Sequence, residues 1–246
     1  MLPVSQSMRA NYAGGVDKYY SEHASTSYRN PHYPGIVKTL STFLDVYAKV
    51  SSSATPSDQE IPTLQVLDMA AGSGEATEAI LNWGKRRLLK KIPSSPLSFK
   101  IVATDPFTGP AYKDRTGREC LALSFADIAN GLLPDQPEIY DIVICSFALH
   151  LLTESSQLWA LLNALATRAK YLVVLAPHKK PSIKPEWGWL RIDPWTLEDV
   201  DEDSTPTSMG GKRGDGYEVY EERVRLRAWR SPHFDVEQNN ARDATR

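Results

Sequence analysis

The sequence predicts an α/β fold with a doubly wound, mostly parallel sheet that closes with an antiparallel C-terminal strand. Three observations lead to this prediction. Short apolar runs rich in β-branched residues alternate with stretches of helical character, which is typical of a parallel sheet covered by helices on both faces. A glycine-containing turn directly follows the first of these runs. The last regular segment, Glu222–Arg230, alternates strictly between polar and apolar residues, as a half-buried strand does.

Length and composition indicate one globular domain of 246 residues. Hydrophobic residues make up 41% of the chain and charged residues 24%, which is enough for a full core. The 28 Lys and Arg nearly balance the 30 Asp and Glu, so net charge favours neither nucleic acid nor an anionic membrane as a partner. The two cysteines exclude a disulfide framework and a thiolate metal site, and no apolar run is long enough to span a bilayer. We expect a cytoplasmic protein, with a nuclear location as the alternative, and no bound metal.

The N-terminal region is expected to form two helices joined by a turn. Aromatic and aliphatic residues recur at helical spacing over Asp17–Tyr47, but Asn30–Gly35 contains two prolines that a helix interior would not accommodate. A short polar segment, Ser51–Pro62, follows and is interpreted as a loop.

Four buried strands and two main helices are expected in the remaining core. The helices are expected over Glu75–Leu89 and His150–Ala169. The strands are predicted at Leu64–Met69, Phe99–Ala103, Tyr140–Cys145 and Tyr171–Ala176. The predicted organisation is a single domain over 1–246, with an N-terminal helical segment at 1–50, a core at 64–230 and a tail at 231–246.

The strongest functional signal is the segment from Val66 to Thr77, where a strand enters a turn containing Gly72 and Gly74. Glycine permits backbone torsions and a close ligand approach that side chains would block. Asp68 at the end of the strand can accept hydrogen bonds from a cationic amino group, and it would repel a pyrophosphate lying against it. Its alternative role is to cap the following helix.

Two further carboxylates stand where a nucleoside could be bound. Asp105 follows the second predicted strand and can accept hydrogen bonds from both hydroxyls of a ribose. Asp127 lies between apolar neighbours and could bind an adenine amino group, with Ile128 or Phe107 packing on the ring. Asp127 could instead simply initiate a turn.

These residues resemble the S-adenosylmethionine site of the class I, Rossmann-like methyltransferases, over roughly residues 66–176. The chain departs from the family's acidic-x-Gly-x-Gly-x-Gly turn by having Ala70 where the first glycine usually stands. The resemblance implies that the first turn holds the methionine moiety, that Asp105 binds the ribose and that Asp127 contacts the adenine. It also implies that the end of the strand starting at Tyr140 faces the transferred methyl group. The cofactor-binding residues expected on this basis are Tyr20, Arg29, Asp68, Ala70, Gly72, Gly74, Asp105, Pro106, Phe107, Asp127, Ile128 and Ser146.

The candidate general bases are His150 and His178, because histidine titrates near neutral pH and both follow strands at the edge where this fold binds ligands. Purely structural roles are the alternative for both. The N-terminal segment resembles the lid that closes over the cofactor in many members of the family, although helix packing would also explain its tyrosines. The residues that carry this resemblance are Tyr19, Tyr20, Tyr28, Arg29 and His32. Trp187 and Trp189 could enclose a substrate or belong to the core.

Three hypotheses follow about function. The first, which near-neutral charge and the tryptophan loop favour, is a methyltransferase that acts on an O or N atom of a small molecule. The second is an RNA or protein methyltransferase, supported by the basic run from Lys85 to Lys91, which could equally be the solvated end of a helix. The third is a non-catalytic or dinucleotide-binding protein. The glycine motif of dinucleotide-binding proteins has a third glycine at the position that Thr77 occupies in this chain, so this hypothesis is disfavoured. The sequence makes no prediction of the oligomeric state.

Overall fold

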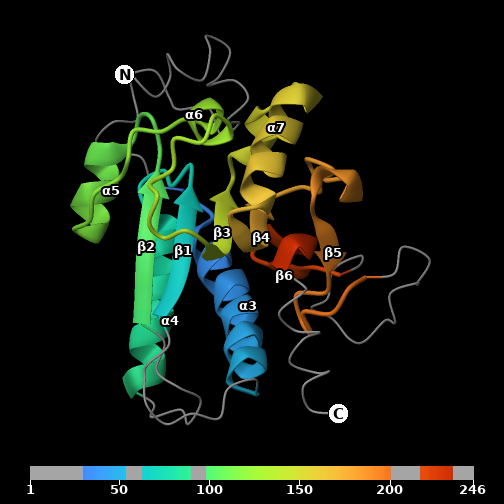
Figure 1. Cartoon of the computed structure of the whole chain (residues 1–246). Helices are drawn as coiled ribbons and strands as arrows, with labels where there is room; N and C mark the ends of the chain where they lie inside the picture. The colour runs from blue at the N-terminus through green and yellow to red at the C-terminus, as the bar shows by residue number, and fades with distance from the viewer. Residues whose placement is uncertain (1–29, 54–62, 90–97, 201–216, 235–246) are drawn as a thin grey trace.

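The computed structural model describes residues 30–53, 63–89, 98–200 and 217–234 (Figure 1). Its centre is a seven-stranded sheet in the order β2-β1-β3-β4-β7-β5, with β6 paired to β7. The strands are β1 (Thr63–Met69), β2 (Ser98–Thr104), β3 (Tyr140–Ser146), β4 (Ala169–Ala176), β5 (Leu190–Ile192), β6 (Val219–Glu221) and β7 (Val224–Arg230).

The first four strands run parallel, and β7 joins the edge of β4 in the antiparallel direction. β5 and β6 both pair with β7, again antiparallel. The predicted doubly wound, mostly parallel sheet with an antiparallel C-terminal strand is therefore confirmed. Because β1, β2 and β3 are parallel neighbours, their carboxyl ends lie at the same edge of the sheet, where α/β folds bind ligands.

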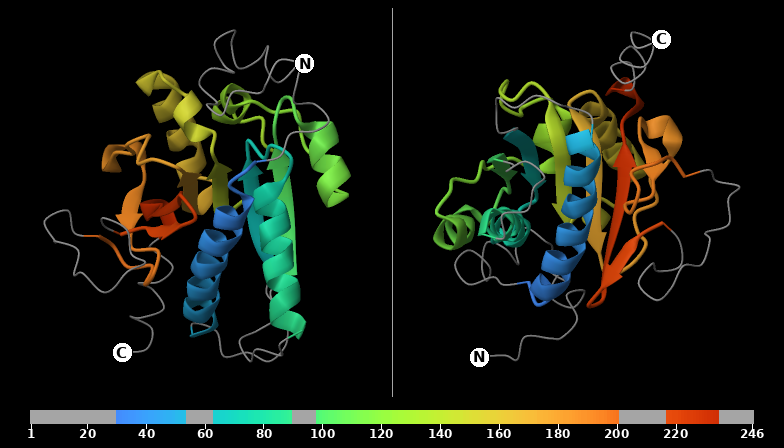
Figure 2. Two further views of the ribbon diagram at one scale, coloured as in Figure 1. Left: turned by 180° about the vertical axis from the view of Figure 1, so that it is seen from behind. Right: turned by 90° about the horizontal axis from the view of Figure 1, so that it is seen from below.

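Helices cover both faces of the sheet (Figure 2). α3 (Tyr33–Ser53) and α4 (Glu75–Leu89) pack together on one face, over a core that includes Ile36, Phe43 and Ile80. α7 (Ser155–Ala166) covers the other face, over a core that includes Leu161. The shorter helices are α5 (Gly109–Thr116), α6 (Phe125–Ala129) and the 3₁₀ turns η2 (Leu149–Leu151), η3 (Pro185–Trp187) and η4 (Pro232–Phe234).

Two predicted elements need correction. The helix expected over His150–Ala169 begins only at Ser155, because the chain first makes the 3₁₀ turn η2 and then becomes extended at Leu152. The strand expected over Glu222–Arg230 begins at Val224. Glu222 and Arg223 form the turn of the β6–β7 hairpin, with φ angles of 48° and 65°.

The N-terminal helical segment is only partly described. Residues before 30 lie outside the described residues, and with them the first predicted helix. The second helix, α3, is part of the core, since Ile36, Leu40 and Phe43 have no exposed surface. This helix therefore belongs to the core and not to a lid over the sheet edge.

Candidate functional site

A cavity of about 570 Å³ opens at the carboxyl ends of β1, β2 and β3. This volume lies within the range of small-molecule sites, about 300–1,000 Å³. Seven predicted cofactor-binding residues line it: Ala70, Gly72, Asp105, Pro106, Phe107, Ile128 and Ser146. The structure thus brings together residues from three successive strand ends that are distant in the sequence.

The turn between β1 and α4 forms one wall of the cavity. Ala70, Gly72 and Gly74 all have left-handed φ angles, of 52°, 57° and 88°. Ala70 therefore adopts, at some cost in strain, a conformation that glycine would adopt freely. Gly74 does not line the cavity. A Cβ at Gly74 would collide with the side chains of Thr116 and Tyr112, so this glycine permits α5 to pack against the turn.

Asp68 lies behind this turn rather than in the cavity wall. It is fully buried, and its Oδ2 accepts hydrogen bonds from the Thr77 backbone amide at 3.1 Å and the Thr77 hydroxyl at 2.7 Å. Its Oδ1 has no hydrogen-bond partner within the described part of the chain. Burial raises the pKa of the Asp68 carboxyl to about 7. The geometry supports the alternative role of Asp68 as a group that fixes the start of α4.

Asp105 follows β2 directly and lines the cavity with 8% of its surface exposed. Its Oδ1 accepts from the Phe107 and Thr108 backbone amides, both at 2.9 Å, and its Oδ2 accepts from the Gly72 amide at 3.1 Å. These three bonds fix the carboxylate in one orientation and tie the first turn to the second. A carboxylate has about four acceptor positions, so it retains capacity for a ligand hydroxyl.

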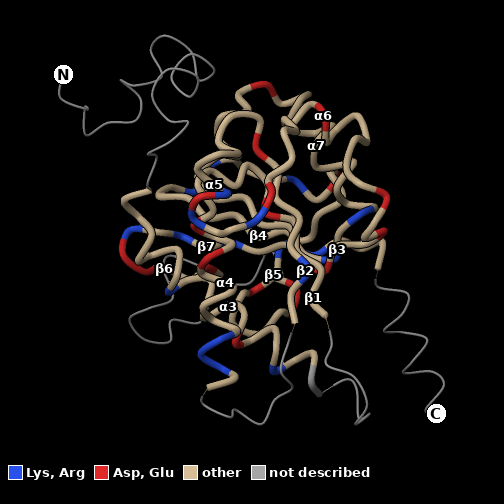
Figure 3. Tube along the Cα trace, turned by 90° about the vertical axis from the view of Figure 1, so that its left-hand side faces the viewer, with Lys and Arg blue, Asp and Glu red and all other residues tan. Residues whose placement is uncertain are grey.

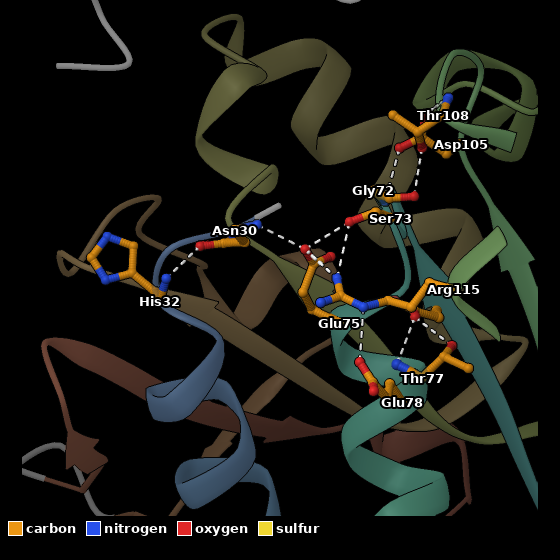
Figure 4. Close-up of polar contacts among 11 residues, drawn as sticks. Asn30, His32, Gly72, Ser73, Glu75, Thr77, Glu78, Asp105, Thr108 and Arg115 are labelled. Atoms are coloured by element: carbon orange, nitrogen blue, oxygen red, sulfur yellow. Dashed lines mark hydrogen bonds and ion pairs between the residues drawn. The ribbon is translucent and has the colours of Figure 1, made fainter. Parts of the chain in front are cut away.

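Glu75, at the start of α4, contributes a second carboxylate to the cavity wall (Figure 4). Its Oε1 accepts hydrogen bonds from the Asn30 amide at 2.8 Å and the Ser73 hydroxyl at 2.7 Å, and it pairs with Arg115 Nη1 at 2.7 Å. None of these contacts uses Oε2. Arg115 also pairs with Glu78 at 2.8 Å, so this end of the cavity carries two carboxylates for one guanidinium.

Part of the cavity wall is apolar. Phe107 and Ile128 lie there as predicted, together with Leu123 and Phe125. Asp127 is not among the lining residues. Its carboxylate accepts from the Ser124 amide and hydroxyl, at 2.8 and 2.7 Å, and completes the capping box at the start of α6. These bonds lower the pKa of Asp127. Its contact with adenine remains a prediction.

The end of β3 forms a third wall. Ser146 has a buried hydroxyl without a hydrogen-bond partner in the described ranges. Phe147 follows with a left-handed φ of 57°, and its ring stacks on the imidazole of His32 with the centroids 5.0 Å apart. Burial and the nearby Arg223 lower the pKa of His32.

His150 and His178 lie next to each other, with ring centroids 5.0 Å apart in an edge-to-face arrangement. Neither lines the cavity. Burial and the neighbouring His178 lower the pKa of His150. Their role as bases remains a prediction.

The other residues singled out in the sequence lie away from the cavity or outside the described residues. Trp187 and Trp189 are buried in the core beside α7. Tyr20 and Arg29 lie outside the described residues.

The basic run from Lys85 is tied in part to the neighbouring helix α3. Arg86 donates to the Ser41 hydroxyl at 2.8 Å, and Arg87 pairs with Asp45 at 3.0 Å. Acidic and basic segments are interspersed over the chain in Figure 3.

Within the described ranges, no group of three or more His, Cys, Asp or Glu side chains is placed to hold a metal ion. No helix in these ranges has the length and apolarity needed to cross a bilayer.

Comparison with known proteins gives one clear relative. No family model matches the sequence. The chain is 42% identical to the uncharacterized protein C17A5.05c of Schizosaccharomyces pombe over 215 residues, which cover 78% of this chain and 82% of that protein. The chain belongs to the C17A5.05c family.

Several solved structures are similar to this member of the C17A5.05c family. One is a TehB-like SAM-dependent methyltransferase from Corynebacterium glutamicum, with 9% identity and a TM-score of 0.42 over 76% of this chain and 87% of that chain. Another is the magnesium protoporphyrin IX methyltransferase of Synechocystis PCC 6803 with bound SAH, with 12% identity and a TM-score of 0.44 over 91% of this chain and 98% of that chain. A third is the N-methyltransferase NodS of Bradyrhizobium japonicum in complex with SAH, with 12% identity and a TM-score of 0.41 over 77% and 85% of the two chains.

The cavity residues that sequence reasoning missed in this C17A5.05c relative include Asn30, Glu75 and Phe147. Glu75 directly follows Gly74, in the first turn of α4. Acidic residues are common in the first turn of a helix because their charge interacts favourably with the helix dipole, so the position of Glu75 alone gave no functional signal. Phe147 directly follows a predicted strand, which is a usable signal. Asn30 is brought to the cavity only by the packing of α3.

Proposed function

We propose that this protein is an S-adenosylmethionine-dependent methyltransferase that acts on an O or N atom of a small molecule. The observation that carries the proposal is that Asp105, Glu75 and residues 70–72 of the first turn line one cavity of fitting size. The apolar part of the wall would contact the adenine, the carboxylate of Asp105 the ribose and the carboxylate of Glu75 the ammonium group.

Asp105 is the proposed ribose ligand. Its orientation is fixed by three backbone amides, so little conformational freedom would be lost when a ribose hydroxyl donates to it. Phe107 and Ile128 would contact the adenine ring from the apolar wall, as predicted.

Glu75 replaces Asp68 in our proposal as the carboxylate that meets the ammonium group. Glu75 lines the cavity, whereas Asp68 is sealed behind the turn. Glu75 and Glu78 share one guanidinium, that of Arg115, so the three side chains together carry a net negative charge. This charge would repel the pyrophosphate of a dinucleotide, which binds at the corresponding turn in nicotinamide-dependent enzymes. The site therefore favours an amino-acid-bearing nucleoside.

Bound S-adenosylmethionine would supply a methyl group already activated by a positively charged sulfur. The protein's contribution is then largely alignment of the acceptor atom with that methyl group. Ser146 and Phe147 line the cavity at the end of β3, where the resemblance to class I methyltransferases places the transferred methyl group.

A small acceptor is favoured over RNA by the position of the basic run. Lys85 lies ten residues along α4 from Glu75, which corresponds to about 15 Å at 1.5 Å per residue. Arg87 is already paired with Asp45 and lies over the ring of Trp83. The basic run is thus at the end of α4 away from the cavity.

Transfer from methyl-labelled S-adenosylmethionine tests the proposal. The protein is incubated with a cell extract separated into small-molecule, RNA and protein fractions. We expect label only in the small-molecule fraction, and an Asp105→Asn variant should bind S-adenosylhomocysteine about 10- to 100-fold more weakly, because one charge-assisted contact is lost. Asp45→Asn is the matched control, because Asp45 pairs with Arg87 and does not line the cavity, and this variant should bind within about threefold of wild type.

Label in RNA or protein would contradict the small-molecule assignment. An absence of label from all fractions, together with no binding of S-adenosylhomocysteine, would contradict the methyltransferase assignment altogether.

A further inference from the structure

Three side chains, of which Phe147 alone lines the cavity, are not assigned to the cofactor in the proposed function. His32 comes from the segment that leads into α3, Phe147 follows β3, and Arg223 lies in the β6–β7 turn. The rings of His32 and Phe147 stack nearly parallel, with 13° between their planes, and Phe147 itself lines the cavity. His32 is therefore linked to the cavity wall at the end of β3.

The β6–β7 turn is held against the beginning of α3. Lys38 pairs with Glu222, and a Cβ at Gly35 would collide with the side chain of Val224 and the carbonyl oxygen of Glu221. Only glycine allows the helix and the hairpin to come this close. The packing holds Arg223 near His32, where its charge contributes to the lowered pKa of the imidazole.

The backbone around this group is strained at three positions that are not glycine. Phe147, Glu222 and Arg223 all have left-handed φ angles, which cost free energy for residues with a Cβ. Such residues concentrate at functional sites because the surrounding structure must hold them in place. Here two separate segments carry the strain, and both lie beside His32.

The electrostatics of the group favour an anion. Arg223 is exposed and forms no ion pair with any residue of the described ranges, while the neighbouring Glu222 is already paired with Lys38. An exposed guanidinium can bind a carboxylate with two parallel hydrogen bonds.

We propose that His32, Phe147 and Arg223 form the acceptor subsite and that the methyl acceptor is a small molecule with an anionic group bound by Arg223. This rests on the proposed methyltransferase function. In the reaction, the acceptor atom forms a bond to the methyl carbon while the carbon–sulfur bond breaks and its electron pair goes to sulfur. The uncharged imidazole of His32 accepts the proton that the acceptor's O–H or N–H gives up.

Binding of a simple anion at His32 tests this subsite. Protein with ¹³C-labelled histidine is titrated by NMR with benzoate and, as the neutral match, benzamide, before and after loading with S-adenosylhomocysteine. A His32→Gln variant identifies the His32 signal. We expect benzoate to shift this signal and to bind about tenfold or more tightly than benzamide, a difference that Arg223→Gln abolishes. Arg118→Gln, which removes an exposed arginine on another part of the surface, should leave the difference intact.

Equal binding of benzoate and benzamide, no shift of the His32 signal, or a preference for benzoate that survives in Arg223→Gln would each overturn the subsite. The same samples distinguish failure of the acceptor subsite from failure of the proposed methyltransferase function. Protein that binds S-adenosylhomocysteine but shows no anion preference at His32 would overturn only the acceptor subsite, and protein that binds benzoate at His32 but not S-adenosylhomocysteine would overturn the methyltransferase function.

Discussion

Asp68 and Asp105 are both carboxylates at strand ends, but their surroundings give them different properties. Asp105 accepts hydrogen bonds from three backbone amides and reaches the cavity. Asp68 accepts two hydrogen bonds, both from Thr77, and is completely enclosed. Burial disfavours the charged form of a carboxyl, so its pKa rises. One carboxylate is thus available to a ligand, while the other stabilises the turn.

The raised pKa of Asp68 makes stability depend on pH in a specific direction. Its folded-state pKa is about 7, against an ordinary value of 3.8, so between these values the folded protein binds more protons than the unfolded chain. The contribution of Asp68 to the free energy of unfolding should therefore fall as pH rises from about 4 to 7, by up to about 4 kcal/mol. In an Asp68→Asn variant, which keeps an acceptor for Thr77, this decrease should disappear. Urea unfolding at pH 5 and pH 8 measures it.

Asp127→Asn serves as the control for this experiment, because hydrogen bonds from Ser124 lower the pKa of Asp127. Its carboxylate stabilises the protein at higher pH, and this stabilisation is lost as pH falls through the lowered pKa. Because the pKa of Asp127 is lowered from 3.8, this loss lies below pH 5, and Asp127→Asn should leave the difference in stability between pH 5 and pH 8 as in wild type. Identical pH profiles for wild type and Asp68→Asn would contradict the assignment of a buried, protonated Asp68.

Glu75 offers a test that isolates the amino-acid part of the ligand. Glu75→Gln keeps the shape of the side chain but removes the charge that would attract an ammonium group. We expect S-adenosylhomocysteine to bind about tenfold more weakly to this variant, since one charge-assisted interaction is lost. Methylthioadenosine lacks the amino-acid moiety, so calorimetry should show no change in its affinity. Equal losses for both ligands would mean that Glu75 acts through the shape of the turn and does not bind the ammonium group.

At the scale of elements, the turn between β1 and α4 depends on Gly74. Its φ of 88° strains any other residue, and an added Cβ would collide with Tyr112 and Thr116 of α5. Gly74→Ala should therefore destabilise the protein by about 2–4 kcal/mol, from left-handed strain and overpacking together. Gly117→Ala is a matched control, because φ is 68° there and nothing lies within 4 Å.

The control should lose only the strain energy, about 1–2 kcal/mol, in the same urea experiment. If the two glycine variants lose equal stability, the close packing of α5 on the turn would be contradicted.

Three of the parallel strands, β1, β3 and β4, could be predicted because they are largely buried and appear as continuous apolar runs, whereas β2 lies at the sheet edge and is only partly buried. The β6–β7 turn could not be predicted, because Glu222 and Arg223 are not residues that a two-residue hairpin turn prefers. Likewise, the apolar residues His150–Leu152 continue the helical pattern of α7, yet they form a 3₁₀ turn and an extended residue. Tertiary packing against the sheet overrides the local pattern at both positions.

The candidate site was predictable where residues directly follow strands. Asp105, Pro106 and Phe107 follow β2, and their place at the sheet edge depends only on strand direction. The position of Glu75 relative to Asp68 could not be predicted, because the conformation of the turn determines which carboxylate faces the cavity. His32 was singled out with the N-terminal tyrosines, but its stacking on Phe147 depends on how α3 packs.

For the whole molecule, the two helical layers form separate cores on the two faces of one sheet. The cavity lies where elements of both layers meet the carboxyl ends of β1, β2 and β3. Glu75 belongs to α4 on one face, and Ile128 belongs to α6, which packs with α7 on the other face. A ligand that fills the cavity would contact both layers and should stabilise the folded protein as a unit.

The central claim is that this cavity binds an amino-acid-bearing nucleoside and not a dinucleotide. Calorimetric titration of the protein with S-adenosylhomocysteine and, separately, with NAD tests it most directly. We expect S-adenosylhomocysteine to bind about 100-fold or more tightly, because the carboxylate of Glu75 attracts the ammonium group of one ligand and repels the pyrophosphate of the other. Equal affinities, or tighter binding of NAD, would contradict the account.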